Sequence, residues 1–294
     1  MISCTEFIPS YSELFSFLED KHGRGEVDLF WNYLFQPDGK GIPLVGFIER
    51  EGIKGCFSYW KGTLNEEAAD FTMYLNEKRG FFHNVMHWCP SKGRLLKLKD
   101  EIGIEPYHDY CLHCDLYRLA AEKCGLKYIY NFTGTDKAAC SMLIYDPKVF
   151  DGRVIIDEDT LIMDRKASDN EYFHLDFHSS LNMGSHYVGE KFGEAELVEY
   201  LTRFTRNVYH PVISAIKEKA LDVLTLDLSE NKLSVKVKEC PAVKHLTGTG
   251  RKMSPWYVYT TTVVMDVLAK AGGYKFEMIS YDPETGAAEY CFTA

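Results

Sequence analysis

The sequence lacks an excess of basic residues. It contains 33 Lys and Arg against 43 Asp and Glu, which gives a formal net charge of −10 at pH 7. An acidic chain repels the phosphates of nucleic acids and of anionic lipids. The composition therefore argues against a nucleic-acid partner and against binding to a charged membrane surface. It does not exclude an anionic small molecule as the substrate.

Long apolar runs and a leader-like N-terminus are also missing. No uncharged apolar run approaches the roughly 20 residues that span a bilayer. Residues 1–6, MISCTE, contain no basic stretch and precede no apolar block. We therefore expect a cytoplasmic protein with no membrane partner. Its nine cysteines are then expected to be reduced thiols rather than a disulfide framework.

Three nucleotide-binding and catalytic motifs are absent. The sequence has no G-x-G-x-x-G, no Walker loop and no nucleophile elbow, which counts against dinucleotide oxidoreductases, P-loop enzymes and α/β-hydrolases. What it has in abundance is aromatic residues, with 19 Tyr, 18 Phe and 4 Trp. With 46% hydrophobic residues, the 294-residue chain can fill a sizeable core.

Two blocks of the sequence recur in the same order. Residues 17–34, FLEDKHGRGEVDLFWNYL, are similar to residues 187–204, YVGEKFGEAELVEYLTRF. A second block follows each of them and keeps a Cys-Pro pair. Ordered self-similarity of this kind predicts an internal duplication. The matched positions of the second block are Cys89 with Cys240, Tyr110 with Tyr259, and Cys140 with Cys291.

The duplication predicts two tandem copies of one α+β domain, residues 1–150 and 166–294, with a linker over residues 151–165. Each copy is expected to run helix, helix, strand, helix, strand, strand, and to form an antiparallel sheet with helices packed on one face. The first copy carries extra residues at about 37–60, whose Gly, Pro and apolar pattern predicts an inserted hairpin.

Local patterns in the second copy support this element order. Residues 233–240 alternate as a half-buried strand does, and residues 259–271 have helical length and spacing before Gly272-Gly273. Residues 274–278 and 288–292 alternate across a turn, which predicts a terminal β-hairpin.

The densest group of reactive side chains is residues 106–115, PYHDYCLHCD. With Asp109 as an N-cap, the dipole of the following helix favours a thiolate at Cys114. An α-helical spacing puts Cys111 and Asp115 on one face. The second copy has no such groups, so the first is the candidate active copy; a buried, inert Cys114 is the alternative. The predicted catalytic residues are Cys114, His108, His113, Asp115 and Cys111.

Two further groups of histidines stand out. His174 and His178 lie one helical turn apart, which suits metal ligation, but the Glu of H-E-x-x-H is absent. His83 and His87 share one face of a predicted strand and could line a pocket. The predicted substrate-binding residues are Tyr110, Tyr117, Trp88, His83 and His87, and the predicted metal ligands are His174 and His178.

Three short motifs together resemble the L-2-amino-thiazoline-4-carboxylic acid hydrolase family. They are Cys89-Pro90, the segment from Cys111 to Asp115, and the segment from Gly134 to Cys140. The resemblance implies a reaction in which water opens a cyclic amidine to give a carbamoyl-cysteine. The sequence departs from the family pattern by carrying two copies, of which the second lacks the Cys-x-x-x-Asp residues. A more distant similarity is to vinyl-reductase-type small-molecule-binding domains, which are often sensors.

The sequence therefore favours a small-molecule hydrolase that opens a cyclic, non-peptide C–N bond. Cys114 or an activated water would attack, His108 or His113 would donate the proton, and Asp115 would hold the ring. The alternative is a non-catalytic ligand-binding or sensor protein, associated in some cases with a metal or haem. The hydrolase hypothesis requires no cofactor and is compatible with a divalent metal. The sequence is also compatible with a homodimer.

Overall fold

The computed structural model describes residues 7–35, 43–66, 69–166, 177–207, 224–229 and 231–294. The chain divides into two compact units. The N-terminal unit is His22–His174, and the C-terminal unit combines Met1–Lys21 with Leu175–Ala294. Both units are mixed α and β with an antiparallel sheet, as the sequence predicts.

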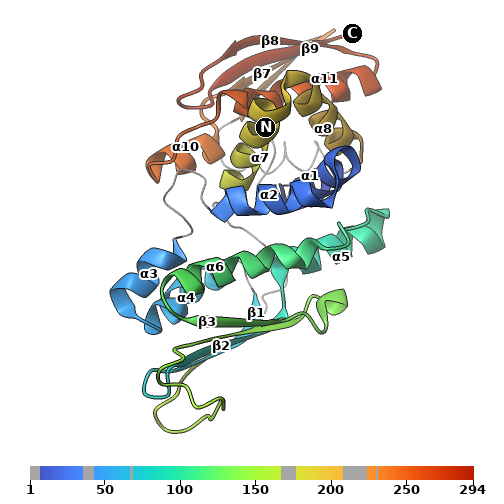
Figure 1. The fold of residues 1–294 in the computed structure, drawn as a ribbon. Coiled ribbons are helices and arrows are strands. Elements are labelled where there is room, and N and C mark those ends of the chain that lie inside the picture. The colour runs from blue at the N-terminus through green and yellow to red at the C-terminus, as the bar shows by residue number, and fades with distance from the viewer. Residues whose placement is uncertain (1–6, 36–42, 67–68, 167–176, 208–223, 230) are drawn as a thin grey trace. The chain divides into compact units, whose positions relative to one another are not determined.

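The N-terminal unit contains a five-stranded antiparallel sheet in the order β3-β4-β2-β1-β5, with helices over one face (Figure 1). Its elements are α2 (Arg24–Phe35), α3 (Leu44–Glu51), α4 (Lys54–Glu66), β1 (Asp70–Asn76), β2 (Phe81–Trp88), α5 (Pro90–Ile102), the 3₁₀ helix η1 (Tyr110–Asp115), α6 (Leu116–Lys123), β3 (Lys127–Asn131), the 3₁₀ helix η2 (Thr135–Lys137), β4 (Cys140–Tyr145) and β5 (Leu161–Arg165).

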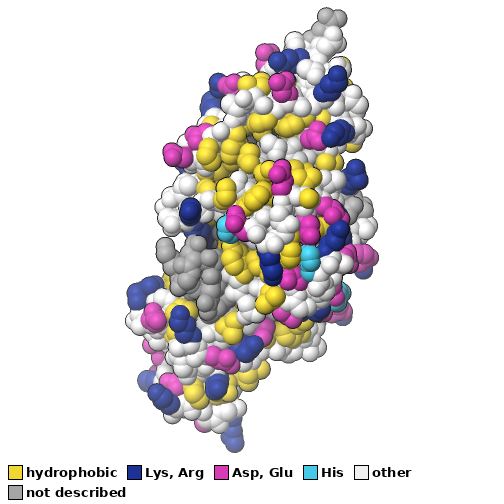
Figure 2. Space-filling model, turned by 45° about the horizontal axis from the view of Figure 1, so that its top comes forward, with side chains coloured by type: hydrophobic (Ala, Val, Ile, Leu, Met, Phe, Trp, Pro, Cys, Tyr) yellow, Lys and Arg dark blue, Asp and Glu magenta, His cyan; other side chains and the backbone are white. Residues whose placement is uncertain are grey.

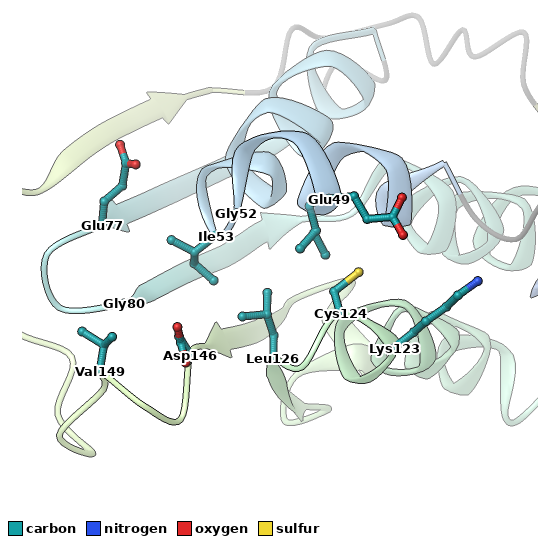
Figure 3. Close-up of a pocket in the computed structure, with 11 residues that line it drawn as sticks. Glu49, Gly52, Ile53, Glu77, Gly80, Lys123, Cys124, Leu126, Asp146 and Val149 are labelled. Carbon is teal, nitrogen blue, oxygen red and sulfur yellow. The ribbon is translucent and has the colours of Figure 1, made fainter.

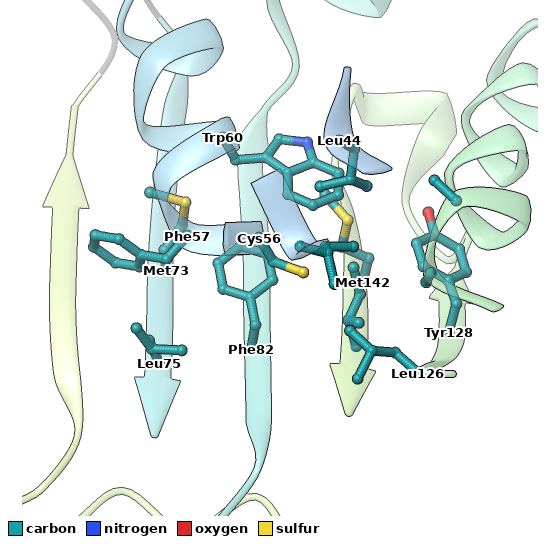
Figure 4. Close-up of a cluster of buried hydrophobic side chains, with 14 of the residues drawn as sticks. Leu44, Cys56, Phe57, Trp60, Met73, Leu75, Phe82, Leu126, Tyr128 and Met142 are labelled. Carbon is teal, nitrogen blue, oxygen red and sulfur yellow. The ribbon is translucent and has the colours of Figure 1, made fainter. Parts of the chain in front are cut away.

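The core of the N-terminal unit lies between this sheet and its helices. Alternate residues of β1, such as Phe71 and Met73, point toward the helices because successive strand side chains face opposite sides. Trp60 of α4 stacks on Phe82 of β2, with ring centroids 5.5 Å apart and an interplanar angle of 17°. Figure 4 shows these two rings together with Leu44 and Met142 between the layers.

The predicted inserted hairpin at about 37–60 is wrong for the described part of this segment. Residues 44–51 and 54–66 form the helices α3 and α4 instead. The buried side chains Leu44, Val45 and Ile48 have the spacing of one helical face, and this periodicity prevails over the Gly and Pro signals. Gly52, with φ of 61°, ends α3 and allows the chain to turn into α4. Residues 37–42 lie outside the described residues.

The predicted boundaries also differ from the observed units. Residues 161–165, expected in a linker, form β5 and pair with β1, where Met163 lies opposite Met73. The helix α1 (Phe7–His22), expected in the first copy, groups with the C-terminal unit, whose helix α8 is Glu194–Asn207. Phe17 contacts Tyr200 of α8 with ring centroids 5.6 Å apart. Tertiary pairing, which the sequence pattern does not encode locally, decides both assignments.

Charged contacts also join α1 to α8. Arg203 pairs with Asp20 at 2.7 Å and with Glu13, and Lys21 pairs with Glu199 at 2.6 Å. These pairs are partly exposed, so each contributes little to stability on its own. Together with the ring contact they fix the register of the two helices.

The C-terminal unit contains a four-stranded antiparallel sheet in the order β6-β7-β9-β8. Its predicted helix over residues 259–271 and its terminal hairpin are both present. Besides α1 and α8, its elements are α7 (Phe177–Phe192), β6 (Leu224–Ser229), β7 (Lys232–Val237), α10 (Pro241–Gly248), the 3₁₀ helix η3 (Pro255–Val258), α11 (Tyr259–Ala271), β8 (Lys275–Tyr281) and β9 (Ala288–Thr293).

The two units share one order of elements around their sheets. Strands β3-β4-β2-β1 of one correspond to β8-β9-β7-β6 of the other. Cys89 and Cys240 each stand at the N-cap of the helix that follows the second strand, before a proline at its first turn. Each helix is followed by a 3₁₀ segment that leads into an α-helix.

The register of the sheets corrects one matched pair. Cys140 lies opposite Met86, three residues before Cys89. The residue in the corresponding place, opposite Val237, is Ala288. Cys140 therefore corresponds to Ala288 and not to Cys291, because the sequence match ignored the different lengths of the preceding turns.

The surface carries charges of both signs. Figure 2 shows acidic and basic side chains interspersed over one face of the molecule. Among the residues that the structure describes, no helix combines the length and apolarity needed to cross a membrane.

Candidate functional site

The reactive cluster of the N-terminal unit lies on the 3₁₀ helix η1, and α6 begins only at Leu116. Asp109 is at the N-cap of η1, but its side chain makes no capping hydrogen bond. In a 3₁₀ helix, side chains three residues apart eclipse one another. The α-helical pairing of Cys111 with Asp115 is therefore wrong. The three edges of η1 are Tyr110 with His113, Cys111 with Cys114, and Leu112 with Asp115.

The first edge anchors η1 in the unit. Tyr110 is 1% exposed, and its hydroxyl lies 2.7 Å from Oγ of Ser91 on α5. Nδ1 of His113 donates a hydrogen bond to the carbonyl oxygen of Tyr110. This donor fixes the neutral tautomer, so that Nε2 carries the lone pair.

Nε2 of His113 lies 3.7 Å from Sγ of Cys114. Burial lowers the pKa of His113 from 6.5 to about 4, so the ring is neutral at pH 7 and able to accept a proton. The pair thus contains a thiol, a neutral base and a backbone carbonyl that orients the base. These are the parts of an activated nucleophile.

The depressed pKa of His113 predicts a pH-dependent stability. The folded state binds the proton only near pH 4, whereas the unfolded state binds it near 6.5. The stabilisation is therefore complete above pH 6.5 and is lost as the pH falls toward 4, a loss of about 3 kcal/mol. Urea unfolding between pH 7 and 4.5 should show a shallower pH slope in His113→Gln than in the wild type. Identical slopes in the two proteins would contradict the assignment.

The second edge of η1 belongs to a group of four thiols, which we call the thiol cluster. Cys114 raises the pKa of each of the other three thiols, and Cys140 raises the pKa of Cys89 and of Cys111, so the four side chains lie in one region of the unit. They come from the N-cap of α5, from η1 and from the start of β4. The members of the thiol cluster are Cys89, Cys111, Cys114 and Cys140.

Three members of the thiol cluster, Cys89, Cys111 and Cys140, are protonated at neutral pH. Burial, reinforced by the neighbouring thiols, raises the pKa of Cys111 to about 12. Burial likewise raises the pKa of Cys140 to about 11, although the Tyr130 hydroxyl lowers it. The Cys114 carbonyl oxygen accepts a hydrogen bond of 3.1 Å from the Tyr128 hydroxyl, which ties the segment to β3.

The third edge of η1 faces a pocket of about 400 Å³ that α2 and α6 also line. Asp115 pairs there with Arg118 at 3.0 Å, and the Arg24 guanidinium lies 4.5 Å from the ring centroid of Trp31. Leu112 and Phe132 add apolar surface. An apolar floor with a few charged groups is the usual character of a small-molecule site. We call it the Asp115 pocket.

The remaining predicted residues are spread over both faces of the sheet. Tyr117 lies on the helix-covered side, with its ring centroid 5.1 Å from that of Trp60. Trp88 lies on that side against α5 and is 43% exposed. His108 contacts Asp109 at 3.6 Å at the surface.

His83 and His87 lie on the sheet face opposite the helices, because they alternate with the core residues Phe82 and Met86. The ring of His83 stacks on Tyr74 with centroids 6.0 Å apart, and burial lowers its pKa. Nε2 of His87 lies 2.9 Å from Oγ1 of Thr72. The structure therefore does not bring these two histidines to the thiol cluster.

The predicted metal pair is only partly covered by the structure. His174 lies outside the described residues, and His178 falls in the first turn of α7, where no side chain is described. Within the described ranges, no group of three or more His, Cys, Asp or Glu residues could hold a metal ion.

A second pocket, of about 440 Å³, was missed by sequence reasoning (Figure 3). It is lined by the α3–α4 turn, the β1–β2 turn and the end of α6, with Glu49, Glu77 and Asp146 around an apolar floor that includes Leu126. Cys124 also lines it, and burial raises the pKa of this thiol. No motif could have revealed the pocket, since its lining comes from four separated segments.

Comparison with protein-family models, curated proteins and solved structures finds no match to this chain.

Proposed function

We propose that the N-terminal unit is a thiol-dependent hydrolase that opens a cyclic C–N bond in a small molecule. The observation that carries the proposal is the pair of Cys114 and His113, with 3.7 Å between Sγ and Nε2 and with the lone pair held on Nε2. The motif resemblance to amino-thiazoline carboxylic acid hydrolases supports the same reaction class.

The reaction runs in two steps. Nε2 of His113 takes the thiol proton as the Cys114 sulfur attacks the ring carbon, and the proton then goes to the leaving ring nitrogen as the C–N bond breaks. In the second step, water attacks the carbon of the sulfur-linked intermediate. Its oxygen stays on that carbon, and its protons restore the Cys114 thiol and the second product. The net change is addition of one water across one C–N bond.

The environment makes His113 necessary for this chemistry. The pKa values of the neighbouring thiols Cys140 and Cys111 are about 11 and 12, so neither of these two is a thiolate at neutral pH. A neutral imidazole that is already oriented removes the proton only as the bond to carbon forms. The raised thiol pKa values therefore fit a mechanism with general-base activation.

The Asp115 pocket supports the size and charge of the substrate. Its volume of about 400 Å³ suits a small ring compound. Arg118 and Arg24 pair with Asp115 and Asp28 in the structure, and they would exchange these partners for a carboxylate substituent of the substrate. The pocket also favours a second candidate function, because Asp115 faces it together with Leu112, on a different edge of η1 from Cys114. A non-catalytic unit would use the same pocket to bind a small anionic ligand.

We further infer that the two units arose by duplication and that the C-terminal copy is inactive. The shared strand order and the paired N-cap cysteines support the duplication. In the sequence match, Thr260 and Val263 stand where the N-terminal unit has Cys111 and Cys114. Such a copy has no thiol to activate on this segment.

The direct test is a panel of cyclic amidines, thiazolines and lactams, each with and without a carboxylate. Ring opening is followed by NMR, and quenched samples are searched by mass spectrometry for an adduct on Cys114. We expect turnover of at least one carboxylate-bearing ring and a transient adduct. Saturable binding without turnover, unchanged in Cys114→Ala, would replace the hydrolase by the binding function.

A further inference from the structure

The thiol cluster contains one pair whose geometry suits a disulfide. Cys111 and Cys114 lie three residues apart on η1, where side chains at this spacing eclipse one another. A 3₁₀ helix rises about 2.0 Å per residue, which puts the two Cα atoms about 6 Å apart along one edge. Disulfides span Cα separations of about 4.4–6.8 Å. Neither cysteine is part of a disulfide in the structure, and both are partly exposed.

The other two cysteines of the cluster are held by the sheet and its turns. The backbone N–H of Cys89 donates to Ala138 at 2.7 Å, and its sulfur accepts a hydrogen bond from the Lys92 backbone N–H. Cys140 pairs with Met86 in the β2–β4 ladder. A bond from either residue to η1 would join two separate elements. A bond between Cys111 and Cys114 stays within one element.

Burial of the cluster also favours the oxidised form. A protein disulfide is a strong oxidant when the protein stabilises a thiolate in the reduced pair. The cluster does the opposite, since burial and neighbouring thiols raise the pKa of Cys111 to about 12. The disulfide is uncharged and carries no such penalty. Once formed, it is therefore expected to resist reduction, while its formation is slow because little thiolate is present.

We propose that Cys111 and Cys114 are a reversible redox pair that closes to an intramolecular disulfide on reaction with a small disulfide such as oxidised glutathione. One thiol attacks the small disulfide and releases one small thiol. The second thiol then displaces the other small thiol. The protein loses two electrons and two protons, and the two small thiols carry them away.

The consequence for catalysis rests on the proposed function. In the disulfide, the Cys114 sulfur has no proton for Nε2 of His113 to take, and it cannot attack a ring carbon as a thiolate. Oxidation therefore switches the hydrolase off, and reduction restores it. Through this pair, the redox state of the cytoplasm would control the activity of the site.

The test begins with the whole reduced chain, equilibrated with oxidised glutathione, quenched with acid, unfolded and alkylated. Trypsin cleavage after Lys99 and Arg118 gives one peptide, residues 100–118, that holds both cysteines. We expect this peptide to be unalkylated and lighter by the mass of two hydrogen atoms, in the wild type and in Cys140→Ser. In Cys111→Ser it should be alkylated or glutathionylated on Cys114. An alkylated wild-type peptide, or a cross-link from Cys114 to Cys140, would overturn the proposal.

A second arm separates this proposal from the proposed hydrolase. Peptide mapping needs no substrate, so its failure leaves the hydrolase standing. Where the disulfide forms, the oxidised wild type should lose ring-opening activity and regain it with dithiothreitol. Full activity in the oxidised form would leave the redox pair in place and overturn the role of Cys114 in hydrolysis.

Discussion

Replacing Cys114 with serine is expected to lower kcat/KM for ring opening by about 10³-fold or more. The serine hydroxyl is a far weaker acid than a thiol, and the pair of His113 with Cys114 supplies only one base, held 3.7 Å away. The bond from His113 to the Tyr110 carbonyl stays intact, so the loss reports on the nucleophile itself. Steady-state kinetics with the best ring compound of the panel measure it.

The matched control is Cys124→Ser. Cys124 is also a partly buried thiol with a raised pKa, but it lies at the C-cap of α6 and lines the other pocket. Its replacement should leave kcat/KM within about threefold of the wild type, because Cys124 lines a different pocket from the one beside Asp115. An active Cys114→Ser protein would return Cys114 to a purely structural thiol.

Replacing Trp60 with alanine is expected to lower the free energy of unfolding of the N-terminal unit by about 3–5 kcal/mol. Trp60 is 4% exposed and stacks on Phe82, so alanine leaves a cavity between α4 and the sheet. Its contact with Tyr117 of α6, at 5.1 Å between ring centroids, is lost as well. The effect combines the lost burial of the indole with the lost ring contacts.

Urea unfolding followed by circular dichroism measures this loss, with two transitions fitted because the chain has two units. Trp88→Ala is the control, since it removes the same ring from a position that is 43% exposed. It should cost less than about 2 kcal/mol. Equal losses in the two variants would show that the Trp60 ring does not fill the core as the structure describes.

The elements that sequence reasoning predicted best are those specified by local signals. The helix over residues 259–271 has a helical apolar spacing and ends at two glycines, and the structure has α11 over the same residues. The terminal hairpin turns where Asp282 accepts hydrogen bonds from Glu284 and Thr285. Both features depend on residues close together in the chain, so the sequence contains their full cause.

The strands β1 and β5 were missed for the opposite reason. β1 is buried on both faces at Phe71 and Thr72, so it shows little alternation between buried and exposed positions. β5 is short, and Leu161 and Ile162 are exposed apolar residues that a linker could equally contain. Each becomes a strand through pairing with a neighbour. Pairing between distant segments leaves little trace in local composition.

The candidate site shows the same division. The sequence placed the candidate reactive residues in one segment and in one of the two halves. It could not distinguish a 3₁₀ helix from an α-helix over residues 110–115, and that difference decides whether Cys111 lies beside Cys114 or beside Asp115. Only the tertiary structure added Cys89 and Cys140 to the cluster and directed the second histidine pair, His83 and His87, to the other face of the sheet.

The sequence by itself determined the α+β class, the net charge of −10 and the segment that holds the candidate site, because composition, periodicity and residue type act locally. The tertiary structure decided that α1 groups with the C-terminal unit, that residues 161–165 complete a sheet, and that four thiols gather around η1. Each of these depends on which distant surfaces bury each other most completely. That choice is made by the free energy of packing over the whole chain, which short-range patterns do not encode.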